Sequence, residues 1–134
     1  MHKGFLKTAA ILAVISVALG AFAAHGLKGK ISDYAIEIFE TAVRYQFYHV
    51  FGLLLAGILY KEFTNGFIKA AGILFILGML LFSGSLYAMA VVKAMVLPGF
   101  NWLGPVTPIG GLCFIAGWIC LFIGFFKPNN KYSK

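Results

Sequence analysis

The stretch FETAVRYQFYHVFGLLLAGILY, residues 39–60, decides the fold of this chain because it joins polar chemistry directly to an apolar helix. Its second half consists of aliphatic, aromatic and glycine residues, whereas its first half includes Arg44 and His49. No glycine or proline occurs between residues 32 and 51, so nothing there breaks a helix. We therefore predict a membrane-spanning helix that carries ionisable side chains in the half preceding its most apolar part.

The composition extends this prediction to the whole chain. Hydrophobic residues make up 61% of the 134 residues and charged residues only 11%, and the mean hydropathy is +0.92. A bilayer core about 30 Å thick needs about 20 helical residues to cross it. The apolar runs of that length predict four spans, at about residues 5–24, 41–60, 67–92 and 107–126. We expect one all-α domain over residues 1–134, an integral membrane four-helix bundle.

The ends of two helices can be predicted more closely. Ser32 or Asp33 can cap the second helix, which then runs to Tyr60 and extends beyond the outer membrane face. We expect the fourth helix to begin with Thr107 as its N-cap and Pro108 in its first turn. The first 26 residues also resemble a secretory signal peptide, but their apolar run is long enough to span a membrane.

The charged residues are distributed asymmetrically between the two sides of such a bundle. The side with both termini and the 61–69 loop holds seven lysines against one acid, and the other side holds four cations against three acids. Cytoplasmic segments carry the excess of lysine and arginine. We therefore expect both termini to lie in the cytoplasm. The net charge of +7 then reflects topology, and we expect no nucleic-acid partner.

Small residues recur at intervals of three, four or seven in every predicted span. Such stripes let helix backbones approach closely in lipid. They are Ala9, Ala13, Ser16, Gly20 and Ala23; Ala42, His49, Gly52 and Ala56; Ala71, Gly78 and Ser85; and Gly110, Cys113, Gly117, Cys120 and Gly124. We expect a close-packed bundle in which His49 faces other helices, and the fourth stripe serves internal packing or a homo-oligomer contact. The two cysteines are two turns apart, too far for a disulfide with each other.

Polar side chains gather in the half of the bundle that this topology places outside. They are His25, Glu40, Arg44, Gln46, His49, Ser83, Ser85, Tyr87 and Thr107. Ionisable groups within a membrane mark function by default. We expect a binding or transport element in which they form one outward-facing pocket for a small anionic or amphipathic ligand: a lipid headgroup, a quinone or an acid. Arg44 should pair with Glu40 one turn away, and His49 should face the first or third span and donate to a serine.

Three other interpretations stay open. The polar cluster can be purely structural and fix helix packing. His25 and His49 can bind haem or a metal between helices, although no cofactor motif is present. An enzyme is the least favoured, because no catalytic motif occurs and a Ser83, His49 and Glu40 triad has only its residue types to support it. His2, near the start of the chain, is assigned no role.

Four motifs in order make this chain resemble a known family. They are GAFAAHGL (20–27), ETAVRYQFYH (40–49), FSGSLY (82–87) and GPVTPIGGLCFIAGW (104–118). Together they resemble the DUF423 family, also labelled UPF0382, small bacterial membrane proteins with animal relatives. The resemblance implies a four-span plasma-membrane protein of uncharacterised function, and it transfers no catalytic or binding residue.

The predicted topology can be tested by cysteine accessibility. In a chain whose native cysteines are replaced by alanine, Lys30→Cys should react with an impermeant maleimide added outside intact cells, and Asn130→Cys should not. Reaction of position 130 from outside would reverse the orientation and place the polar half of the bundle in the cytoplasmic leaflet.

Overall fold

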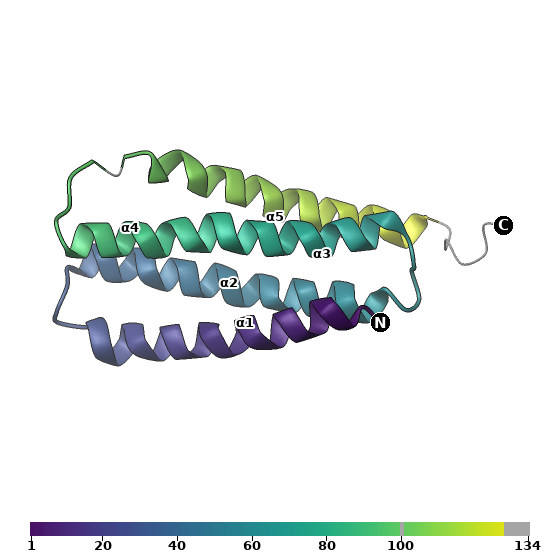
Figure 1. Cartoon of the computed structure of the whole chain (residues 1–134), viewed down its shortest axis with the longest axis horizontal. Coiled ribbons are helices and arrows are strands. Elements are labelled where there is room, and N and C mark those ends of the chain that lie inside the picture. The colour runs from purple at the N-terminus through teal and green to yellow at the C-terminus, as the bar shows by residue number, and fades with distance from the viewer. Residues whose placement is uncertain (100, 128–134) are drawn as a thin grey trace.

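The computed structural model of the chain describes residues 1–99 and 101–127 and consists of four long antiparallel rods (Figure 1). The first rod is α1 (Lys3–Ala21) continued by the π-helical turn η1 (Phe22–Leu27), and the second is α2 (Asp33–Leu59). The third rod joins α3 (Gly66–Gly78), the π-helical segment η2 (Met79–Ser83) and α4 (Gly84–Ala94), and the fourth is α5 (Leu103–Phe126). All four are long and apolar enough to cross a membrane. The predicted all-helical architecture with four candidate spans is thus confirmed.

The second helix has the predicted bounds, because it has a capping residue at its start and no helix-breaking residue in its first half. The Ser32 hydroxyl accepts a hydrogen bond from the Ala35 backbone N–H at 3.3 Å, which satisfies one of the amides at the helix start. The helix then continues without interruption to Leu59.

The predicted start of the fourth helix is wrong. α5 begins at Leu103, four residues before Thr107, so Pro108 lies inside the helix. Pro105 falls in the first turn, where its missing N–H costs nothing, whereas Pro108 deprives the Gly104 carbonyl of its helical donor. Thr107 does not cap the helix, because its hydroxyl forms a hydrogen bond with Ser85 of α4.

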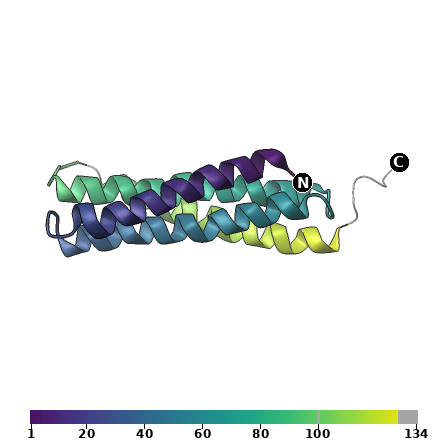
Figure 2. The ribbon, with the colours of Figure 1, turned by 90° about the horizontal axis from the view of Figure 1, so that it is seen from below.

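The rods are arranged so that α1 and α5 lie at opposite edges (Figures 1 and 2). α1 packs along α2, α2 packs along the third rod, and α5 packs along α3 and η2. The start of α1 and the end of α5 share one end of the molecule. We call the opposite end, which carries residues 28–32 and the α4–α5 connection, the far end.

Glycines of α5 bring this helix into close contact with the third rod. Gly110, Gly117 and Gly124 are buried. A Cβ atom added to Gly110 would overlap the backbone nitrogen of Phe82, and one at Gly117 would lie 2.8 Å from the Phe75 ring. The stripe predicted in the fourth span therefore packs internally against the third rod, where small residues let the backbones meet.

The other predicted stripes are also largely buried. All four stripe residues of α2 and all three of the third rod are buried, His49 among them. Gly72 and Gly78 lie so close to the rings of Phe5 and Phe114 that an added Cβ would overlap them. In the first span Ala13 and Gly20 are only half-buried, because α1 packs mainly along one neighbour.

Two residues without an assigned role anchor the end that carries the start of α1. The Asn65 side chain accepts the backbone N–H groups of Phe67 and Ile68, and its amide donates to the Gly124 carbonyl at 2.9 Å. His2 caps α1 through its Nδ1 atom, which accepts from the Phe5 N–H at 3.2 Å. Both residues satisfy backbone groups at helix ends that lipid could not satisfy.

The contact between α5 and η2 can be tested with two adjacent glycines. Gly110→Ala should lower the free energy of unfolding by about 1–3 kcal/mol, because its Cβ overlaps backbone that cannot move aside cheaply. Gly111→Ala is the matched control, since its Cβ would meet the Phe82 ring at an ordinary 3.8 Å. Equal unfolding transitions for the two variants in a detergent titration would contradict this packing.

Candidate functional site

One group of predicted site residues is a hydrogen-bonded chain that crosses three rods. Tyr87 of α4 donates its hydroxyl proton to Gln46 Oε1 at 3.0 Å, and Gln46 Nε2 donates to the Leu12 carbonyl of α1 at 3.2 Å. That carbonyl also accepts from the Ser16 hydroxyl at 2.8 Å. Gln46 is buried and both ends of its amide are used. These groups therefore connect helices and are not free to bind a ligand.

A second group joins α4 to α5. Ser85 Oγ donates to the Phe82 carbonyl at 2.9 Å, which uses its single proton. The 2.7 Å contact between Ser85 and Thr107 is then a bond donated by the threonine hydroxyl. Ser83, at the end of η2, is fully buried, and its hydroxyl has no hydrogen-bond partner within residues 1–99 and 101–127.

His49 faces α5 and not a serine of the third rod. Its ring stacks on Phe114 with centroids 3.4 Å apart and an interplanar angle of 9°, while Phe75 of α3 lies at 5.8 Å. The 2.7 Å contact between Nδ1 and the Tyr45 carbonyl requires the proton to sit on Nδ1. The ring does reach α3 of the third span, as expected, but the expected hydrogen bond from His49 to a serine is wrong, because Nδ1 bonds the Tyr45 carbonyl. The ring packs within an aromatic cluster on the α5 side.

The other histidine is remote from His49. His25 is exposed at the far end, in η1. The bond between Gln46 and Leu12 sets the register of α1 against α2, and from that point the two histidines lie in opposite directions. The helical rise separates them by about 24 Å, too far for joint ligation of one metal or haem. No group of three metal-ligating side chains occurs in the part of the chain that the structure describes.

Glu40 does not pair with Arg44, which corrects the predicted salt bridge. Arg44 Nη2 donates to Thr41 Oγ1 at 3.2 Å, and that hydroxyl in turn donates to the Glu37 carbonyl at 2.8 Å. Glu40 is exposed and lines a cavity of about 280 Å³ beside η1, together with Lys28 and two other acids of α2. The i, i+4 spacing permitted the pair, but the two side chains border separate cavities along the first rod, Glu40 beside η1 and Arg44 beside α1. The imagined triad of Ser83, His49 and Glu40 is not formed either.

Arg44 lies at the edge of a lipid-facing groove between the first two rods. The groove has a volume of about 250 Å³, and its walls come from α1 (Ser16, Val17) and α2 (Val43, Arg44, Phe47, Tyr48). Its surface is almost entirely apolar, because the Ser16 hydroxyl is bonded to the Leu12 carbonyl and Arg44 lines the groove with its hydrocarbon stem. The predicted single pocket is thus divided: some residues tie helices together, and Arg44 borders an open apolar groove with its guanidinium at the edge.

These features define the class of protein. Four apolar helices whose buried polar groups are satisfied mostly within the chain form a small multi-pass helical membrane protein. The chain belongs to the DUF423 family, whose profile, described as a protein of unknown function, matches residues 19–111.

Similar proteins carry the label UPF0382 membrane protein. SH2409 of Staphylococcus haemolyticus is 45% identical over 125 residues, which cover 93% of this chain and 97% of the relative. SAB0533 of Staphylococcus aureus is 43% identical over the same shares of the two chains. YwdK of Bacillus subtilis is 40% identical over 126 residues, 93% of this chain and 98% of the relative. No solved structure matches the chain. The family resemblance is confirmed, and with it a bacterial membrane protein with four candidate spans.

The bond between Tyr87 and Gln46 can be tested by removing one oxygen. Tyr87→Phe leaves the ring in place but removes the donor to Gln46, so the free energy of unfolding should fall by about 0.6–1.7 kcal/mol. Tyr48→Phe is the control, because Tyr48 is exposed toward the surrounding lipid. In a double-mutant cycle with Gln46→Leu, additive effects would show that the two side chains do not interact.

Proposed function

We propose that this protein is a membrane binding element that takes up an anionic amphiphile in the groove between α1 and α2. The negative headgroup would lie on the Arg44 guanidinium and the alkyl part along the apolar walls. The observation that carries the proposal is a guanidinium on a membrane-spanning helix whose bonded side-chain partner is a neutral hydroxyl, that of Thr41.

The electrostatics of Arg44 favour an anion. A charged side chain within a span is costly and normally pairs with an opposite charge or reaches the interface. Arg44 lies about 16 Å from the start of α2, and its contact with Thr41 directs it back toward the far end. Its planar fork has five donors and suits phosphate or carboxylate. Donors not used by Thr41 are therefore available to a headgroup at the level of the interface.

The shape of the groove favours a partly embedded ligand. Pockets that enclose a small molecule usually have a volume of about 300–1,000 Å³, and this groove, at about 250 Å³, is smaller and open to the side. Val17, Val43 and Phe47 offer apolar surface beside the single cation. An amphiphile can place its headgroup and first methylenes here while its remaining chain stays in the bilayer.

The competing structural interpretation applies to different residues. Gln46 and Tyr87, and separately Ser85 and Thr107, use their hydrogen bonds between helices. We assign those residues to helix packing and keep Arg44 as the binding residue. A catalytic role has no comparable support, since the polar side chains best placed to act are engaged in these contacts.

We further propose a plasma-membrane location with both termini in the cytoplasm. The excess of lysine on the side of the termini supports this orientation. Arg44 would then lie in the outer leaflet. Binding of an amphiphile there is the simplest activity consistent with a guanidinium whose bonded side-chain partner is neutral. Transport would need a further step on the cytoplasmic side.

The proposed function can be tested by native mass spectrometry of the purified protein in mild detergent. With equal amounts of dioleoyl phosphatidylglycerol and phosphatidylcholine, the wild-type protein should retain the anionic lipid preferentially. Arg44→Gln should lower that preference about tenfold, because a hydrogen bond to a charged group contributes about 1.5–3 kcal/mol. Arg44→Lys should keep part of it.

Lys69→Gln supplies the matched control, because Lys69 is an exposed cation at the opposite end of the bundle. An unchanged lipid preference in Arg44→Gln, or an equal loss in Lys69→Gln, would contradict binding at the groove. Thermal unfolding of each variant establishes that the fold is intact.

A further inference from the structure

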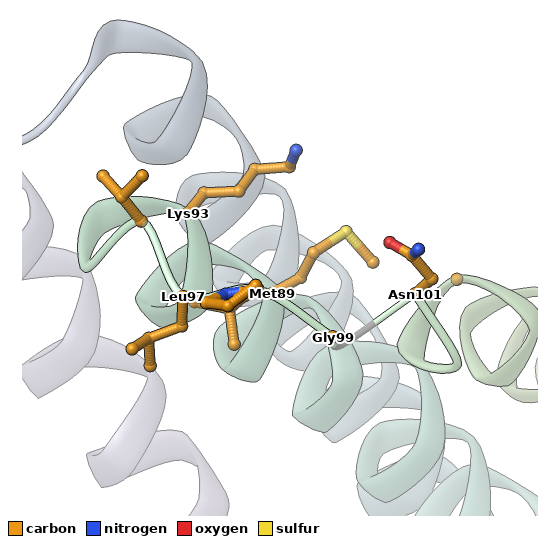
Figure 3. Close-up of a pocket in the computed structure, with 9 residues that line it drawn as sticks. Met89, Lys93, Leu97, Gly99 and Asn101 are labelled. Atoms are coloured by element: carbon orange, nitrogen blue, oxygen red, sulfur yellow. The ribbon is translucent and has the colours of Figure 1, made fainter.

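A larger cavity lies at the far end, between the last turns of α4 and the first turn of α5 (Figure 3). Its volume is about 600 Å³. Met89 and Lys93 of α4 line it together with Leu97 and Asn101 of the α4–α5 connection. The polar clusters predicted from the sequence include none of these residues, because the connection reads as an apolar interfacial loop.

The backbone turns sharply after α4, at the edge of this cavity. The Leu97 N–H donates to the Val92 carbonyl and the Val96 N–H to the Lys93 carbonyl, at 3.1 and 3.3 Å. This is a Schellman motif, whose left-handed position is usually occupied by glycine. Here Val96 occupies it with a φ of 52°. A β-branched residue in this conformation is strained, and local strain of this kind gathers at functional sites.

The lining combines one positive charge with apolar walls. Lys93 Nζ lies 5.0 Å from the centroid of the Tyr34 ring of α2, and none of the described residues that line the cavity carries a carboxylate. Figure 3 shows the Lys93 amine and the Asn101 amide projecting toward the same rim, with the Met89 side chain between them. The amide can donate and accept hydrogen bonds. The rim therefore offers a cation and a neutral polar group above an apolar floor.

The surroundings indicate a membrane interface. Val96 is 85% exposed and Trp102 is 62% exposed, and both lie at the end of a candidate span. Tryptophan is enriched at the level of lipid headgroups. Exposed apolar residues around a single cation match a phospholipid, whose phosphate and alkyl parts meet at this depth, better than a free anion in water.

We propose that this cavity binds an anionic phospholipid with a hydroxylated headgroup, of the phosphatidylglycerol type. The phosphodiester pairs with Lys93 Nζ, a headgroup hydroxyl bonds the Asn101 amide, and the glycerol backbone and first methylenes lie against Met89 and Leu97. The volume of about 600 Å³ is within the range for small-molecule pockets. This site is on α4 and α5 and does not rest on the groove at Arg44.

The test uses the full chain in mild detergent, with lipid retention read by native mass spectrometry. Two probes have the same charge: dioleoyl phosphatidylglycerol, which has headgroup hydroxyls, and dioleoyl phosphatidylmethanol, which has none. The wild-type protein should prefer phosphatidylglycerol. Asn101→Leu should remove this preference. In an Arg44→Gln background, which removes the groove as a second site for anionic lipid, Lys93→Gln should weaken binding of both probes about tenfold, whereas Lys93→Arg should restore it. Arg44→Gln should leave the difference between the two probes unchanged, which separates this site from the groove.

Several outcomes would overturn the proposal. Equal retention of the two probes by the wild-type protein would remove the headgroup contact with Asn101. An equal loss in Lys30→Gln, an exposed lysine at the same end, would reduce the effect to general surface charge. Competition by inorganic phosphate alone, without any lipid preference, would make the cavity a site for the free anion.

Discussion

Hydrogen-bond partners inside the chain are the constraint on which this structure depends, because a bilayer offers none to a polar group. The Leu12 carbonyl, Gln46 and Tyr87 form a chain across three rods, and each bond can form in only one helix register. On the other side of the bundle, glycines let the backbone of α5 pack directly against backbone and side-chain atoms of the third rod. Specific polar contacts on one side and close apolar packing on the other together fix how four otherwise similar helices associate.

The same constraint separates the structural polar groups from those available for binding. Groups with internal partners are fixed in place, and using them for a ligand would leave a buried donor or acceptor unsatisfied. Arg44 and Lys93 differ, since each carries a full charge at the edge of a hollow and pairs with no carboxylate among the described residues. In the orientation that we propose from the distribution of lysines, both hollows are external. The two proposals together assign this chain two distinct contacts for anionic lipid in one leaflet.

The sequence predicted most of the fold and less of the site, for reasons that particular residues make clear. The bounds of α2 follow from Ser32 and an uninterrupted helix, which tertiary contacts do not oppose. The prediction that Thr107 caps the fourth helix was wrong. A threonine before a proline is typical of a helix start, but here the Thr107 hydroxyl forms a hydrogen bond with Ser85 of α4. Periodicity showed that His49 is buried but could not show which neighbour covers it. The sequence did not predict Lys93 and Asn101 as site residues, because their proximity depends on the path of the connection between α4 and α5.

The most direct measurement of anionic-lipid binding uses the fact that Arg44 is the single arginine of the chain. Protein labelled with ¹⁵N-arginine in phosphatidylglycerol bilayers gives one guanidinium signal, whose dipolar coupling to lipid ³¹P reports contact with a phosphate. Binding at the groove predicts strong dephasing, as for charge-assisted bonds with N–O distances of about 2.8 Å. Absence of dephasing in these bilayers would show that Arg44 reaches only water and Thr41, and would contradict the assignment of this residue to lipid binding.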